Sequence, residues 1–170
     1  MTKIPEHETW FNTGVMLLEN KKYPEAQDNF QKAINIEPKF IPAWVYKGIS
    51  LEKLQQYEEA IECYSQAIQI NPDVADLWYN KGATYCMMKR YRDALTCFDK
   101  VLELEPDHAL AKTTRALVIA KPPMIEIPAN KPDKDGNKEG SNSEEVEISI
   151  PKYREWNIEL GRFSEKEMEE

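Results

Sequence analysis

A tryptophan followed four residues later by a glycine occurs three times in this chain of 170 residues. The pairs begin at Trp10, Trp44 and Trp78, so each copy starts 34 residues after the one before it. Self-similarity at a fixed period of roughly 20 to 50 residues is typical of repeat architectures, in which each copy is one structural unit packed on its neighbours. This period therefore constrains the fold more than any other feature of the sequence.

Alignment of the three copies divides the chain into units of residues 7–40, 41–74 and 75–108. Every unit also carries a tyrosine, an alanine, an aromatic residue and a proline at fixed positions. These residues are Tyr23, Tyr57 and Tyr91; Ala26, Ala60 and Ala94; Phe30, Tyr64 and Phe98; and Pro38, Pro72 and Pro106. The pattern resembles the tetratricopeptide repeat family, whose 34-residue units carry Trp, Gly, Tyr, Ala, an aromatic residue and Pro in this order.

The residues themselves predict two antiparallel helices in each unit. Apolar residues recur at helical spacing on both sides of a short polar break such as Asn20-Lys21-Lys22. Pro24 suits the first turn of a second helix, where its missing N–H would have no partner. The prolines near the unit ends terminate the second helices, because the residue before a proline avoids helical geometry. The expected fold is all-α, and the resemblance implies a right-handed superhelical solenoid of three helix hairpins.

The recurring glycines indicate close packing between the two helices of a unit. A glycine inside a helix costs about 0.5–1 kcal/mol relative to alanine, so three at one register indicate a packing requirement rather than a binding site. We expect Ala26, Ala60 and Ala94 to oppose the glycines, and the tryptophans to fill the space where the two helices diverge.

One further helix is expected over residues 109–120, with Ala116 at the register of the glycines. We expect this helix to cap the array. The three apolar side chains of Leu110, Leu117 and Val118 should be packed on the preceding helices. The two basic side chains of Lys112 and Arg115 should be exposed.

The composition changes at residue 121, where prolines and polar turn-forming residues become frequent. Residues 121–170 are therefore predicted to be a largely disordered, acidic tail. Two short islands inside it, Met124–Pro128 and Val146–Pro151, alternate apolar and polar residues as extended segments do. Our hypothesis is that these islands dock on a partner or fold back on the repeats.

Charge and composition disfavour several classes of partner. The net charge of −8 opposes binding to nucleic acid and to anionic membranes. The longest purely apolar run is Ala116–Ala120, too short to span a membrane. Cys63, Cys86 and Cys97 form no CxxC pair and have no nearby histidine, so we expect reduced thiols, no zinc site, no cofactor and a cytoplasmic location.

No catalytic motif is recognisable in the sequence. His7 and His108 are the only histidines, and both lie at unit boundaries without a partner motif. The sequence has no HExxH, no GxSxG and no phosphate-binding glycine loop. We therefore expect a protein that is not an enzyme.

The resemblance implies a concave groove lined by the first helices, with the second, fifth, sixth, ninth and thirteenth positions of each unit facing it. The candidate partner-binding residues at these positions are Phe11, Asn12, Val15, Tyr46, Ile49, Lys53, Tyr79, Asn80, Ala83 and Met87, accompanied by Val45 and Asp76. Aromatic and amide side chains in such a groove suit an extended peptide or a helix of another protein. Tyr46, Tyr79 and Asn80 are the strongest candidates, whereas Val45, Ile49 and Ala83 are equally well explained as core.

A subset of the family that this chain resembles has a carboxylate clamp. In that clamp, lysine, asparagine and arginine side chains hold the C-terminal carboxylate of a chaperone. The positions of that clamp hold Phe11, Val15, Tyr46, Asp76 and Asn80 in this chain, so the cationic residues are missing. We predict that this chain lacks the clamp.

Two functions remain open at this point. The first is an adaptor or chaperone that holds a peptide of another protein in the groove. The second is a scaffold that self-associates, because nothing before His7 is typical of a cap on the first helix.

Overall fold

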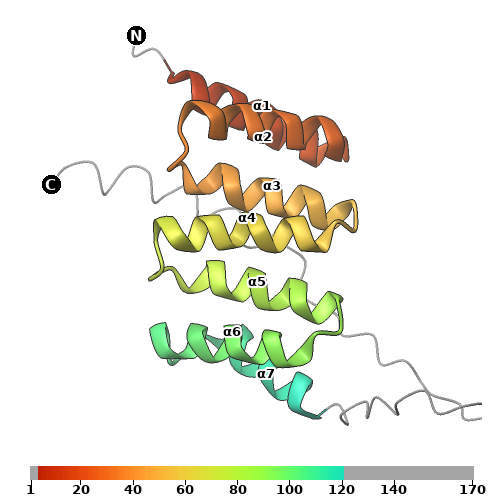
Figure 1. The fold of residues 1–170 in the computed structure, drawn as a ribbon, viewed down its shortest axis with the longest axis vertical. Coiled ribbons are helices and arrows are strands. Elements are labelled where there is room, and N and C mark those ends of the chain that lie inside the picture. Colours follow the sequence, from red (N-terminus) through yellow and green to blue (C-terminus); the bar gives the residue numbers. More distant parts are fainter. Residues whose placement is uncertain (1–3, 121–170) are drawn as a thin grey trace, which may run out of the picture.

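In the computed structural model of the chain, the described residues are 4–120. They form α helices and no strand, in the order α1 (Glu6–Glu19), α2 (Tyr23–Ile36), α3 (Ile41–Lys53), α4 (Tyr57–Ile70), α5 (Ala75–Met87), α6 (Tyr91–Leu104) and α7 (Ala109–Ala120) (Figure 1). The predicted all-α fold is confirmed. The predictions for residues 121–170 lie outside the described residues.

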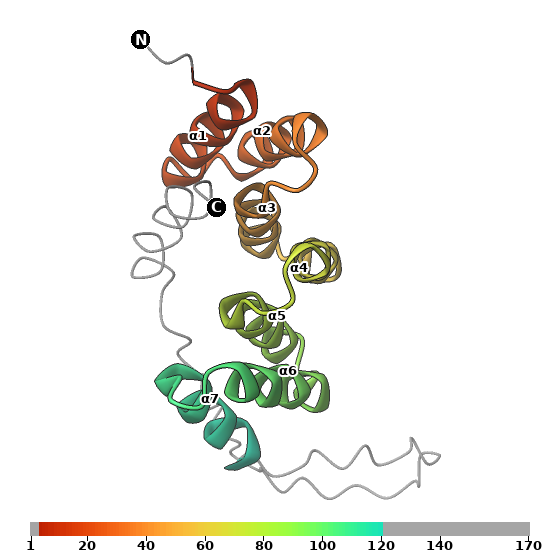
Figure 2. The same cartoon turned by 90° about the vertical axis from the view of Figure 1, so that its left-hand side faces the viewer.

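The helices stack in series, and each packs mainly on the helix before it and the helix after it. Figure 2 shows that the row is curved, with α1, α3, α5 and α7 on its concave side and α2, α4 and α6 on its convex side. The predicted solenoid of three hairpins and a capping helix is therefore correct.

The helix ends follow the proline chemistry read from the sequence. Glu37, Asn71 and Glu105 come directly before the three prolines, and their backbones leave helical geometry with φ of −130°, −141° and −130°. Pro24 lies in the first turn of α2, as predicted.

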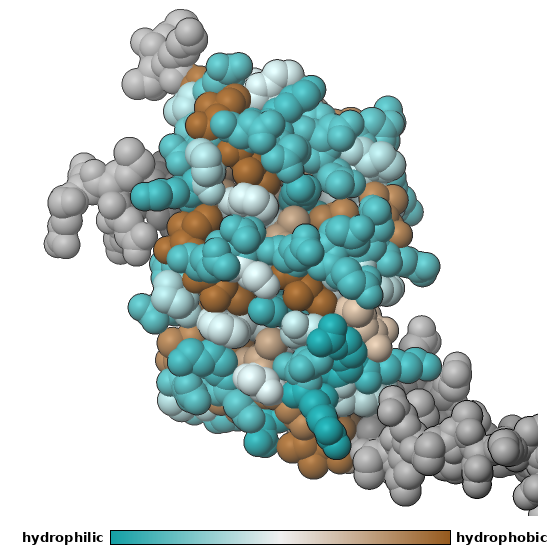
Figure 3. All heavy atoms as spheres, in the orientation of Figure 1, coloured by the Kyte–Doolittle hydropathy of each residue, from teal (hydrophilic) through white to brown (hydrophobic). Residues whose placement is uncertain are grey.

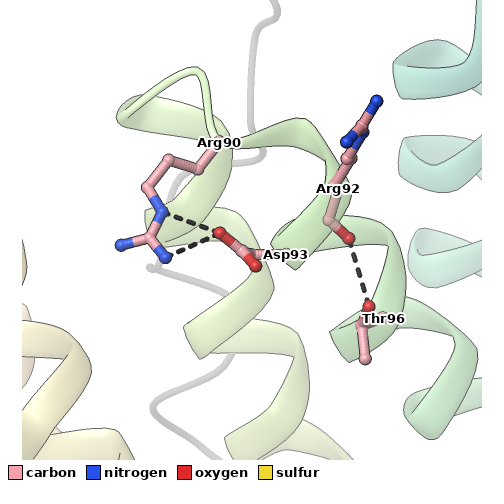
Figure 4. A network of polar contacts seen from close by, with 4 residues as sticks. All are labelled: Arg90, Arg92, Asp93 and Thr96. Carbon is pink, nitrogen blue, oxygen red and sulfur yellow. Dashed lines mark hydrogen bonds and ion pairs between the residues drawn. The ribbon is translucent and has the colours of Figure 1, made fainter.

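The turn inside each hairpin repeats a less favourable backbone geometry. Lys21, Gln55 and Lys89 have φ of 60°, 61° and 59°, in the left-handed region that favours glycine. After the third of these turns, the Arg90 guanidinium donates to the Asp93 carboxylate over 2.7 Å at the start of α6 (Figure 4). This pair is exposed, so it contributes little to stability.

The glycines do mark close packing, but the side chain opposite them differs from the prediction. A β-carbon added at Gly48 would lie 2.9 Å from Cε1 and Cζ of Tyr64, and one added at Gly14 would lie 2.6 Å from Cε1 of Phe30. The third glycine meets Phe98 in the same way. The ring of the second helix, rather than the alanine, fills the volume that a side chain would need.

Trp44 and Trp78 join successive units, whereas Trp10 packs beside Ala33 and Ile34 of its own hairpin. The indole N–H of Trp44 donates to the carbonyl of Pro38 over 2.8 Å, and that of Trp78 donates to the carbonyl of Pro72 over 2.9 Å. Trp78 also packs against both of the larger buried clusters of the array. Each tryptophan of the later units therefore fixes its first helix to the end of the preceding unit.

The capping helix α7 packs differently from the prediction at two positions. Val118 is buried and Leu110 partly buried, as expected, but the Leu117 side chain is 48% exposed. Arg115 is partly buried and donates to the Asp99 carboxylate over 2.6 Å. Leu117 lies open because no described helix covers that side of α7.

Candidate protein-binding face

The ten predicted partner-binding residues lie on the three first helices that line the concave side of the row (Figure 2). α1 carries Phe11, Asn12 and Val15, α3 carries Tyr46, Ile49 and Lys53, and α5 carries Tyr79, Asn80, Ala83 and Met87. The fold thus brings together helices that are far apart in the sequence.

Burial separates these ten residues into two groups. The buried group is Tyr46, Ile49, Tyr79, Asn80 and Ala83, each no more than 6% exposed. Asn12 and Lys53 are exposed, and Phe11, Val15 and Met87 are partly exposed. Only the second group can contact a partner without a rearrangement of the helices.

Tyr46 packs between the first two units. Its ring meets that of Phe11 edge-on at 5.2 Å between centroids and that of Phe30 at 5.8 Å. Burial raises the pKa of the Tyr46 phenol, and the nearby Glu19 carboxylate raises it further. Tyr46 therefore stays neutral and holds α3 against the first hairpin.

Tyr79 packs between α5 and α7. Its ring stacks on that of His108 with 5.5 Å between centroids, and its hydroxyl lies 3.2 Å from the hydroxyl of Thr114. Burial raises the pKa of Tyr79, although the hydrogen bond with Thr114 acts in the opposite direction. His108 Nδ1 accepts the Ala111 N–H, and its Nε2 lies 3.6 Å from Asp76 Oδ1. His108 thus serves the packing of α7.

A buried carboxylate joins the second and third units. Glu52 on α3 is only 6% exposed, and it accepts a hydrogen bond from the Thr84 hydroxyl on α5. The same hydroxyl lies 2.9 Å from the backbone oxygen of Asn80. This contact could not be predicted from the sequence, because a glutamate at this position is typical of a solvated helix face.

The sixth position of the units explains why exposure varies within one register. Tyr46, Asn80 and Thr114 share this position and are buried. Tyr46 packs on Phe11 and Phe30 of the preceding unit, and Thr114 lies against Tyr79 of the preceding unit. Asn12 has the same position in α1 and is exposed, because no described helix packs on that side of α1. Exposure here depends on the neighbouring unit rather than on residue type.

Glu19 also lies at a register of this face, although it was not among the ten predicted residues. Glu19 is exposed and occupies the thirteenth position of its unit, the same register as Lys53 and Met87. The 34-residue period alone would have identified it. The thirteenth positions thus place an acid, a base and a thioether on α1, α3 and α5.

The opposite side of the row has a different character. Figure 3 shows the convex face, which is largely hydrophilic with hydrophobic residues between the helices. A hollow of about 460 Å³ lies there between α2, α3 and α4, lined by groups that include Trp44, Lys47 and Glu59 and by none of the ten predicted residues. Within residues 4–120, no group of three His, Cys, Asp or Glu side chains is placed to hold a metal ion. No helix in the described part of the chain is both long enough and apolar enough to span a bilayer.

Comparisons with known proteins agree with this geometry. Models of the tetratricopeptide repeat match residues 7–40, 29–62 and 75–108, and a TPR repeat model matches residues 50–89. The chain belongs to the tetratricopeptide repeat family. A search of curated proteins returns no relative for this sequence.

Several solved structures share the fold. The first TPR domain of Spaghetti (RPAP3), bound to the HSP90 peptide SRMEEVD, aligns with a TM-score of 0.63 and 19% identity over 67% of this chain and 90% of that one. The Arabidopsis OM64 TPR domain aligns with a TM-score of 0.62 and 18% sequence identity, over 66% of this chain and 93% of that one. The crystal structure of MamA aligns with a TM-score of 0.63 and 20% sequence identity, over 66% of each chain. Identities this low establish a common fold and no more.

Proposed function

We propose that this protein is a non-catalytic interaction module whose concave face holds a peptide segment or a helix of another protein. It acts either as an adaptor within a larger assembly or as a chaperone for an exposed client segment. The fold supports the general part of this proposal, since solenoids of this family present a curved surface to other proteins.

One observation carries the proposal. Phe11, Val15 and Met87 remain partly exposed on α1 and α5, beside the exposed polar side chains of Asn12 and Lys53. Apolar side chains next to amide and ammonium groups can bury a partner's side chains and also pair with its main chain. The buried tyrosines support this surface from below and are not its contacts.

The chemistry of the face argues against an acidic ligand. The Spaghetti domain is bound to the peptide SRMEEVD, which has three carboxylate side chains. In this chain, by contrast, Glu19 and Asp76 present carboxylates from α1 and α5, and the clamp positions lack cations. Like charges would oppose such a peptide. We infer that the ligand is a neutral or basic segment with apolar anchors.

A peptide-display selection on the full chain, followed by calorimetry, tests the proposal. The variant Asn12→Ala/Lys53→Ala/Met87→Ala should weaken the selected peptides at least about tenfold, equivalent to ~1.4 kcal/mol. The matched control is Asp28→Ala/Glu62→Ala/Arg92→Ala, which changes exposed residues of α2, α4 and α6 on the convex side. Equal weakening in the two variants would refute binding on the concave face.

The peptide SRMEEVD provides a second, negative probe. We expect no measurable heat of binding at micromolar concentration. Salt-sensitive micromolar binding would show that this chain does hold acidic C-termini, and the inference about ligand charge would then be wrong.

Self-association through α1 is the second candidate function. Met16 favours it, because this residue is 64% exposed whereas Ser50 and Thr84 at the same register are buried, Thr84 against Glu52 of the preceding unit. The neighbouring Thr9 and Thr13 are polar, which makes the surface a weak interface. Light scattering should show a monomer at all concentrations if the module function is right, and a mass that grows with concentration if stacking dominates.

A further inference from the structure

The outer face of α7 is the most exposed apolar surface at the C-terminal end of the row. Leu117 and Ile119 are 48% and 55% exposed, and Ala116 and Ala120 beside them are also exposed. These four side chains form what we name the open face of α7.

On α3 the residues at the same register are covered. Leu51 has the same register as Ile119 and is 1% exposed, because α4 packs over it. Ile49 has the same register as Leu117 and is 6% exposed. Gly48 corresponds to Ala116 and lies against the Tyr64 ring of α4. α7 has no described helix in the place of α4, so side chains of a kind buried elsewhere stay in contact with water.

We propose that the segment Met124–Pro128 of this chain covers the open face of α7. The described residues end at Ala120, within α7 itself, and fifty residues follow. Pro122 and Pro123 have no backbone N–H to donate, and the residue before a proline disfavours helical geometry, so the sequence predicts that the helix ends close to Ala120. An apolar segment thus follows the uncovered helix directly.

The distances allow the contact. Ile125 comes five residues after Ala120, which gives it a reach of up to ~17 Å in extended form. Leu117 lies only ~4.5 Å along the axis from Ala120. In an extended segment Ile125 and Ile127 project to one side with a spacing of ~6.6 Å, close to the ~6 Å rise that separates Ala116 from Ala120, four residues further along the helix. The two isoleucines can therefore lie over the two alanines, flanked by Leu117 and Ile119.

Tethering favours this segment over a second copy of the chain. A short flexible link gives an effective concentration in the millimolar range, on the order of a thousand times that of protein in a micromolar solution. The same apolar contact made between two molecules would have to overcome this difference.

Thiol labelling at the open face tests the proposal. Leu117→Cys introduces a reactive thiol at an exposed site, whereas Cys63, Cys86 and Cys97 are buried and react slowly. Two proteins are compared, the full chain with Leu117→Cys and the same chain with Ile125→Asp and Ile127→Asp added. We expect a maleimide to label the introduced thiol about tenfold more slowly in the first protein. This difference in rate is equivalent to ~1.4 kcal/mol. Labelling in denaturant gives the unprotected rate of each variant.

The matched control changes the other alternating island, through Ile148→Asp and Ile150→Asp, and should leave the slow rate unchanged. Hydrogen exchange of the α7 amides, measured without the introduced cysteine, should become faster only with the substitutions at Ile125 and Ile127. Equal rates in all variants, or protection lost in the control instead, would overturn the proposal. Protection that rises with protein concentration would also overturn it and would identify a second copy as the occupant.

Discussion

The substitution Gly48→Ala tests the packing argument that underlies the fold. The added β-carbon would lie 2.9 Å from Cε1 and Cζ of Tyr64 and 3.3 Å from its hydroxyl oxygen. The Tyr64 ring is fully buried, so it cannot move aside at little cost. Overpacking of this kind costs about 1–3 kcal/mol.

A second, opposing effect sets the expected magnitude. Alanine stabilises a helix interior by about 0.5–1 kcal/mol relative to glycine. Gly48→Ala should therefore lower the free energy of unfolding by about 0–2.5 kcal/mol, the overpacking cost less the helix gain. Ala116 has the same register on α7 but is exposed, and no described helix follows α7 in the place that α4 takes after α3. The reverse change Ala116→Gly should destabilise by ~0.5–1 kcal/mol through helix propensity.

A double-mutant cycle with Tyr64→Leu isolates the clash, because leucine lacks all three of the crowding atoms. In that background Gly48→Ala should stabilise the protein by ~0.5 kcal/mol. Urea denaturation followed by far-UV circular dichroism measures all four proteins. If Gly48→Ala stabilises the parent chain, or costs the same in both backgrounds, the ring is not what requires the glycine.

Three further predictions concern stability. Thr84→Val removes the hydroxyl that donates to the buried Glu52 carboxylate, and should lower the free energy of unfolding in urea by about 1–3 kcal/mol. Gln55→Gly should raise the melting temperature, because relief of left-handed strain of ~1–2 kcal/mol exceeds an entropy cost of ~0.5–1 kcal/mol; a lower melting temperature would contradict this account. Burial raises the pKa of the Cys63 and Cys97 thiols from 9.0 to about 11, so their contribution to stability is complete below pH 9 and is lost as the pH rises through 11. Urea titrations between pH 9 and 11 measure how the free energy of unfolding falls as the pH rises. This fall should be smaller for Cys63→Ala/Cys97→Ala than for the parent chain, and an equal fall would count against buried neutral thiols.

The candidate face was only partly predictable from the sequence. The register identified the helices and the ten positions, and its extension to Glu19 needed no structure. The register did not predict which of these positions are accessible to a partner. Tyr46 and Asn80 share a register with Asn12, yet the first two are buried and the third is exposed. Each outcome depends on whether another unit packs against that side of the helix.

The sequence alone determined the period, the two helices of each unit and the points at which the second helices end. These properties are local, since they follow from helical spacing and from the geometry that a proline imposes on the residue before it. The tertiary structure decided what lies opposite the glycines, where the indole N–H of Trp44 donates, and that Leu117 is uncovered. These contacts join residues of different helices or different units, and their geometry is set by how the helices pack, which a one-dimensional pattern does not contain.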